Sequence, residues 1–112
     1  KDDGRLRIWT DASYAHGVAG LAIVGSLGEH WKRVKAPSSS YAEIMAMRWA
    51  LQEAYAAKLP PFTRFYTDCG AVIPRFQWIA LRDHGWIVKQ ISRTGNRRAD
   101  YLAGKARLNP RD

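Results

Sequence analysis

Four acidic residues have the residue type and the placement to do metal chemistry: Asp11, Glu43, Asp68 and Asp100. Each stands near the predicted end of a strand or the predicted start of a helix. Four carboxylates gathered within a few ångströms would repel one another strongly unless a cation lay between them. Ligands that are all oxygen favour Mg²⁺ or Mn²⁺ over zinc, and the cysteine and histidine spacing resembles no zinc site.

Each acid also has an ordinary structural explanation. Asp11 could begin a turn, and Glu43 could complete a capping box with Ser40. Asp68 could cap a helix, and Asp100 could serve as a first-turn acid that suits the helix dipole. Taken singly, each of these explanations is stronger than a catalytic one. Taken together they are weaker, because the predicted topology can bring all four positions to one place.

The pattern of apolar residues predicts an α/β domain spanning residues 1–112. Three strands with short connections read as an antiparallel meander. The later strands are joined through helices and should therefore lie parallel to the first. The order β-β-β-α-β-α-β-α predicts a mixed five-stranded sheet with helices on its faces. The expected strands cover residues 5–10, 18–25, 29–35, 62–67 and 86–91, and the expected helices cover residues 41–58, 72–82 and 97–108.

This topology explains how the acids could meet. Functional groups collect at the carboxyl ends of parallel strands, where Asp11 follows the first strand and Asp68 follows the fourth. Glu43 shares a helix face with the apolar Met47 and should point toward the sheet. Asp100 lies one turn into the last helix, for which Asn96 is the predicted N-cap.

Composition narrows the class of partner. The 112 residues carry a net charge of +8, of which +6 falls in residues 69–112 and +2 in residues 1–68. Charge alone fits two interpretations equally well: a polyanion partner, most often nucleic acid, and a surface whose charge only keeps the protein in solution. No apolar run approaches the ~20 residues of a membrane span. A single cysteine, Cys69, excludes an internal disulfide framework and fits a reducing compartment. We therefore expect a cytoplasmic monomer with no membrane association.

At this point the sequence resembles the type 1 ribonuclease H family and the related ribonuclease H domains of reverse transcriptases. The resemblance covers roughly residues 5–107. Four motifs carry it, in order and each at the expected element: Thr10-Asp11-Ala12-Ser13, Ser38-Ser39-Ser40 with Ala42-Glu43, Thr67-Asp68-Cys69, and Asn96-Arg97-Arg98-Ala99-Asp100-Tyr101-Leu102-Ala103.

The resemblance implies an endoribonuclease that hydrolyses the RNA strand of RNA/DNA hybrids and leaves 5′-phosphate and 3′-hydroxyl ends. It implies two Mg²⁺ ions, with Mn²⁺ as a substitute, held by the four carboxylates. Asp11 would bridge the two ions. Glu43 and Asp68 would complete one site, and Asp100 the other.

The same resemblance implies where substrate binds. The expected contacts are Ser13, His16, Ser39, Ser40, Arg75, Trp78, Arg93 and Asn96. Three features depart from the family pattern. Arg93 stands where many bacterial members have a histidine-containing loop, Ala12 replaces the usual glycine, and a basic insertion found in some members is absent.

Two other functions of the same fold stay open on the sequence. One is a non-catalytic module that binds hybrid or double-stranded RNA, suggested by the net charge and the missing histidine loop. The other is a related nuclease of the superfold that acts on DNA, such as a transposase or a junction resolvase. Retention of all four acids argues against the first, and the serine-rich approach to Glu43 argues against the second.

Overall fold

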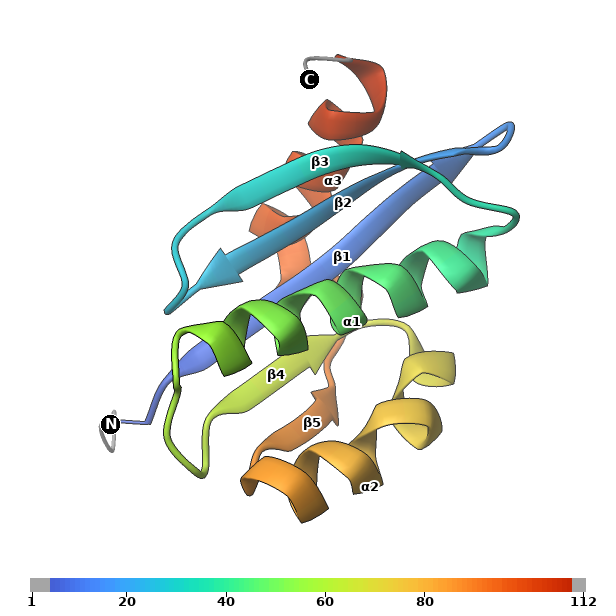
Figure 1. Ribbon diagram of the computed structural model, residues 1–112. Helices are drawn as coiled ribbons and strands as arrows, with labels where there is room; N and C mark the ends of the chain where they lie inside the picture. Colours follow the sequence, from blue (N-terminus) through green and yellow to red (C-terminus); the bar gives the residue numbers. More distant parts are fainter. Residues whose placement is uncertain (1–4, 110–112) are drawn as a thin grey trace.

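The computed structural model describes residues 5–109. Its five strands form one sheet in the order β3-β2-β1-β4-β5 (Figure 1). β1 pairs antiparallel with β2, and β2 pairs antiparallel with β3. β4 lies parallel to both β1 and β5. The strands are β1 (Arg7–Ala15), β2 (Val18–Gly25), β3 (His30–Lys35), β4 (Arg64–Thr67) and β5 (Ile87–Gln90).

Three α-helices cover the sheet unequally. α1 (Ser39–Ala56) packs on β1 and β2 from one side, where α2 (Ile73–His84) packs beside β5. α3 (Arg97–Leu108) lies on the opposite side, against β1, β2 and β3 (Figure 1). Two short 3₁₀ turns, η1 (Gly70–Val72) and η2 (Arg93–Asn96), precede α2 and α3. The mixed sheet and the element order predicted from the sequence are therefore confirmed.

The main core lies between α1, α2 and the sheet. Ile8, Phe65 and Val88 occupy one row across β1, β4 and β5, and all three are buried. They pack in one cluster with Met47 of α1 and Phe76 of α2. Side chains alternate between the faces of a strand, so the neighbours of this row face the other side of the sheet.

Helix ends follow the local chemistry of the sequence. Pro74 stands in the first turn of α2, where its missing N–H costs nothing. Gly85 ends that helix in the left-handed conformation, with φ 71°, which glycine adopts without steric cost. Among the described residues, no helix combines the length and apolarity needed to cross a membrane.

Several predicted boundaries differ from the structure, most of them by one or two residues, and two of the differences affect the site. β1 does not stop near residue 10 but continues to Ala15, because the hairpin with β2 keeps pairing as far as Ala15 and Val18. α1 begins two residues earlier than predicted, and its N-cap is Ser38, whose hydroxyl accepts from the Tyr41 backbone N–H at 3.1 Å. Ser40 is therefore inside the helix, and the predicted capping box with Glu43 does not form.

Candidate active site

The candidate site opens where two parallel strands part. β1 pairs with β4 only from Arg7 to Trp9, although β1 itself runs on with β2. Asp11 thus lies within a strand, opposite Ala22, rather than at the strand end predicted from the sequence. It still stands just past the last β1–β4 pair, and Asp68 directly follows β4. Both carboxylates therefore lie at the carboxyl edge of the parallel ladder.

Asn96 occupies the gap that the parting strands leave. Its Nδ2 donates to the backbone oxygen of Thr10 at 2.9 Å. Asn96 is 1% exposed, and its side chain makes no helix-capping hydrogen bond. Asn96 is the N-cap residue of α3, as predicted, but its side chain does not cap the helix, because the amide is buried and bound to the strand that carries Asp11. The predicted contact between Asn96 and substrate stays a prediction. The last family motif in the sequence includes Asn96, but its contact with Thr10 follows only from the three-dimensional arrangement of the strands.

Three of the four predicted acids meet in this gap. Asp11, Glu43 and Asp68 each offer one carboxylate oxygen, and these atoms lie within 4.8 Å of one another. Glu43 reaches the cluster from the second turn of α1, on the same buried line of that helix as Met47 and Ala50. The chain thus directs a carboxylate inward from a helix face that is otherwise apolar.

The electrostatics of the cluster reflect burial and crowding. Desolvation is the main reason that the pKa of Asp11 rises to about 7, and the charge of Asp68 adds to it. The Ala12 backbone N–H opposes this rise by bonding to the Asp11 carboxylate. Desolvation also raises the pKa of Glu43 to about 9, with further contributions from Asp11 and Asp68. The two carboxyls titrate as an interacting pair.

Asp100 joins the cluster from the last helix. Its side chain hydrogen-bonds with Asp11 and raises the pKa of that carboxyl. Its charge also raises the pKa of Glu43. Asp100 is itself exposed, in the first turn of α3. The structure therefore places the fourth predicted acid beside the other three, at the solvent side.

The donor set fits a hard divalent cation. All the candidate ligands are carboxylate oxygens, which suit Mg²⁺ and Mn²⁺. The buried Glu43 Oε1 has no hydrogen-bond partner, and buried polar atoms seldom lack one. A cation would be bound by this oxygen and would offset the repulsion that adds to desolvation in raising the two pKa values.

Two predicted contacts, Ser13 and His16, lie further along the β1–β2 hairpin than Asp11. The Ser13 hydroxyl accepts from Arg107 Nε at 2.8 Å, so α3 already engages it. His16 is at the tip of the β1–β2 hairpin, with φ 49°, next to Gly17. That tip is five residues beyond Asp11, roughly 16 Å along the strand. Ala12 continues the strand opposite Leu21, so this position does not need the conformational freedom of glycine.

The other predicted substrate contacts are on the surface. Ser39 and Ser40 are exposed in the first turn of α1. Trp78 is 65% exposed on α2, so it is not a core aromatic. Arg75 is exposed near the start of that helix, and Arg93 is exposed in η2.

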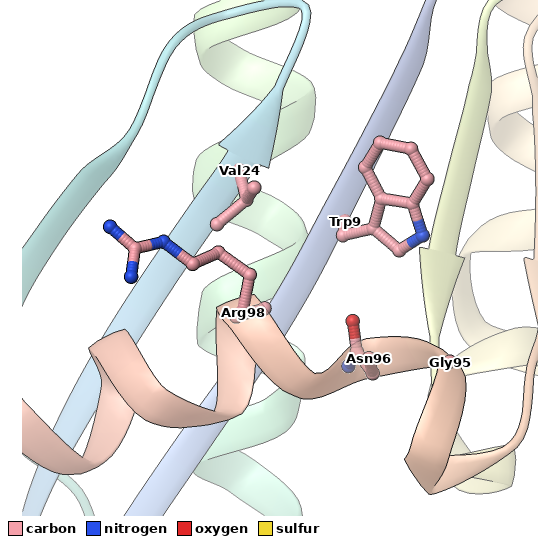
Figure 2. Close-up of a pocket in the computed structure, with 6 residues that line it drawn as sticks. Trp9, Val24, Gly95, Asn96 and Arg98 are labelled. Carbon is pink, nitrogen blue, oxygen red and sulfur yellow. The ribbon is translucent and has the colours of Figure 1, made fainter.

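A pocket that no sequence motif indicates lies behind Asn96. It holds about 210 Å³ between the sheet and the start of α3 (Figure 2). Trp9 and Val24 form its sheet side, and Gly95, Asn96, Arg98 and Ala99 form its helix side. Trp9 and Val24 belong to paired strands, so the strand register would have been needed to find this pocket.

Comparisons with known proteins agree on the fold. No protein-family model matches the sequence, and no curated protein matches it either. Solved structures do match. LC11-RNase H1, isolated from compost, superposes with a TM-score of 0.76 at 17% identity, covering 93% of this chain and 96% of that one.

Two further matches are a viral reverse transcriptase and another ribonuclease H. The foamy viral protease–reverse transcriptase in complex with an RNA/DNA hybrid gives a TM-score of 0.67 at 14% identity, covering 90% of this chain and 20% of the viral one. LC9-RNase H1, a type 1 ribonuclease H with the type 2 active-site motif, gives 0.63 at 12% identity, covering 99% and 76% of the two chains. The chain therefore has the ribonuclease H-like fold shared by type 1 ribonucleases H and the ribonuclease H domains of reverse transcriptases.

Proposed function

We propose that this chain is a metal-dependent endoribonuclease that hydrolyses the RNA strand of RNA/DNA hybrids, leaving 5′-phosphate and 3′-hydroxyl ends. The observation that carries the proposal is the approach of Asp11, Glu43 and Asp68 within 4.8 Å at the edge of the parallel strands. The fold is the one in which such an acid cluster serves hydrolysis in the family that the sequence resembles.

In this proposal Asp11, Glu43, Asp68 and Asp100 hold two Mg²⁺ ions, for which Mn²⁺ substitutes. Bound there, the ions would supply an activated water and would stabilise the leaving 3′ oxygen. The protein contributes rigid placement. Asp11 is fixed by a strand paired on its β2 side, and Glu43 by a helix that packs on β1.

The surrounding surface suits a polyanion. The net charge is +8. Arg75 is exposed in α2, the helix that follows Asp68, and Arg93 is exposed in η2, just before the helix that carries Asp100. The exposed first-turn serines of α1, Ser39 and Ser40, offer hydroxyl groups that can hydrogen-bond a ribose 2′-hydroxyl. Trp78 offers an exposed aromatic surface for the other strand. The foamy viral protease–reverse transcriptase, which shares the fold, has been seen with an RNA/DNA hybrid.

The test is cleavage of a panel of labelled duplexes of one sequence: RNA/DNA hybrid, double-stranded DNA and double-stranded RNA. We expect metal-dependent cleavage of the RNA strand of the hybrid alone. Cleavage of the DNA duplex with the hybrid left intact would favour a DNA nuclease of the same fold. Binding of the hybrid without cleavage in Mg²⁺ or Mn²⁺ would favour a non-catalytic module.

A further inference from the structure

The described helices leave one part of the sheet without cover. α3 packs on β1, β2 and β3, and Figure 1 shows it behind those strands and not behind β4 or β5. Ile8, Phe65 and Val88 form a buried row across three strands. The residues next to them along each strand point to the opposite, uncovered side. None of them is fully buried, in contrast to that row.

We call this surface the rear platform and define it by two rows of paired residues. One row is Arg64 and Ile87; the other is Trp9, Tyr66 and Lys89. The rings of Trp9 and Tyr66 stack, with centroids 5.4 Å apart and planes 27° from parallel. Lys89 is exposed at the outer end of the same row. The rear platform thus joins an aromatic pair to cationic side chains.

The pocket behind Asn96 borders the rear platform, because Trp9 lines both. The buried Asn96 Oδ1 has no hydrogen-bond partner. The amide cannot be turned to relieve this, since the Thr10 oxygen needs the Nδ2 donor. In Figure 2 that oxygen is drawn on the side of Asn96 that faces Trp9. With about 210 Å³, the pocket is smaller than the ~300 Å³ lower range of drug-sized sites and suits a single ring.

We propose that the rear platform binds a single-stranded segment of nucleic acid. Bases would stack on the Trp9–Tyr66 pair, and phosphates would lie along Arg64 and Lys89. One base would enter the pocket beside Trp9 and donate an N–H to Asn96 Oδ1. Aromatic stacking beside a basic surface is how proteins hold single strands without reading their sequence, and a sheet face bearing aromatics is a common platform for RNA.

The position of the rear platform relates it to the proposed active site. Trp9 and Asp11 are two residues apart on one strand, so both side chains leave the same face. A single strand on the rear platform would therefore lead toward the carboxylates. The inference rests on the proposed function in one respect: the single strand would be an extension of the hybrid that the active site cuts.

A protein partner is the competing occupant. The charged side chains that define the rear platform, Arg64 and Lys89, are both cationic. Their charge complements a phosphate backbone directly, and the rest of the chain is basic as well. A surface built for a protein domain would have less reason to set cations around a partly buried aromatic pair. We therefore favour nucleic acid and leave the protein partner as an outcome of the test.

The test is fluorescence anisotropy with labelled 12-nucleotide single strands of RNA and DNA, on the whole chain and without divalent metal. Two variants change the rear platform: Tyr66→Leu removes the stacked ring, and Lys89→Glu reverses an exposed charge. Lys35→Glu, exposed on β3, is the matched control for net charge. We expect Tyr66→Leu and Lys89→Glu each to weaken binding roughly tenfold, and Lys35→Glu to weaken it far less.

Two results would overturn the inference. One is equal weakening by Lys89→Glu and Lys35→Glu together with unchanged binding by Tyr66→Leu, which would show a diffuse charge effect. The other is absence of single-strand binding in the wild-type protein, which would leave the rear platform to a protein partner. Cleavage of a blunt hybrid, which has no extension, is measured on the same variants. If the wild-type protein does not cut the blunt hybrid, the proposed function is contradicted. The result for single-strand binding would still stand.

Discussion

Asn96 Nδ2 donates to the backbone oxygen of Thr10 at 2.9 Å, which ties the start of α3 to the residue directly before Asp11. The bond joins two segments 86 residues apart in sequence at the point where β1 and β4 separate. It replaces a strand-to-strand hydrogen bond that β4 does not supply. The placement of Asp11 therefore depends on the last helix as well as on the sheet.

Asn96→Ala should loosen this connection. The buried Thr10 oxygen would lose its donor, at a cost of about 1–3 kcal/mol in the free energy of unfolding. Cleavage should slow more than the loss of folded protein explains, because Asp11 would lose its support. Urea unfolding and kcat under folding conditions measure the two effects. Asn109→Ala is the control, since Asn109 makes the same kind of bond to Lys105 on an exposed surface. Equal effects of the two substitutions would refute the account.

The metal-free protein should lose stability as pH rises. The pKa of Asp11 is raised from 3.8 to about 7, and that of Glu43 from 4.5 to about 9. The folded state therefore holds protons that the unfolded state releases above pH ~4, and the free energy of unfolding falls between about pH 4 and pH 9. At about 1.4 kcal/mol for each pKa unit, the total decrease in the free energy of unfolding is at most on the order of 10 kcal/mol. Denaturant unfolding in EDTA at several pH values measures this slope.

Glu43→Gln supplies the control for that pH dependence. Glutamine keeps the shape of the side chain and cannot ionise, so the slope should become shallower and the metal-free variant should be more stable than wild type at pH 8. Mg²⁺ should stabilise the wild type more strongly as pH rises, because binding requires deprotonated ligands. An unchanged slope in Glu43→Gln would mean that this carboxyl is not the group that titrates.

Close packing of β2 against α3 predicts a strong effect at Gly20. A Cβ at this position would overlap the Ala103 backbone oxygen, and the backbone there has little room to move. Gly20→Ala should lower the free energy of unfolding by at least about 2 kcal/mol. Gly104→Ala, on α3 itself, is the control, because an added Cβ there meets nothing within 4 Å. It should stabilise the protein by up to about 1 kcal/mol; destabilisation by both would show that α3 is packed differently.

Trp78 should matter for substrate and not for folding. The side chain is 65% exposed, so Trp78→Ala should leave the melting temperature nearly unchanged. We expect KM for the hybrid to rise about fivefold or more, the size of a typical aromatic contact. Tyr55→Ala is the comparison. Tyr55 is a similarly exposed aromatic residue, with 68% of its surface accessible, and it lies near the C-terminal end of α1. If the two variants have the same KM, the substrate does not lie on α2.

Local patterns in the sequence sufficed for the element order and for the direction of the strands. The glycine-bounded run at residues 18–25 and the double proline after residue 59 are strong signals of a buried strand and of a helix stop. The end of β1 was misplaced because Asp11 and Ser13 resemble turn residues, whereas pairing with β2 holds them in a strand. Tertiary pairing overrode the local preference.

The site was predictable only in part for the same reason. The acids could be named from their places at the ends of elements and from the family resemblance. The bond that Asn96 makes in place of a capping bond could not be predicted, because its partner, Thr10, is 86 positions away. The rear platform needs the register of Trp9, Tyr66 and Lys89 across three strands. No local pattern contains that register.

The most direct measurement is the initial rate at which a labelled RNA/DNA hybrid is cut in Mg²⁺ by the wild-type protein and by Asp11→Asn. The variant removes one negative charge from a crowded cluster, so it should fold at least as well as the wild type near pH 8. We predict metal-dependent cutting of the RNA strand by the wild type and a rate at least about a hundredfold lower for the variant. Equal rates for the two folded proteins, or no metal-dependent cutting by either, would contradict the account.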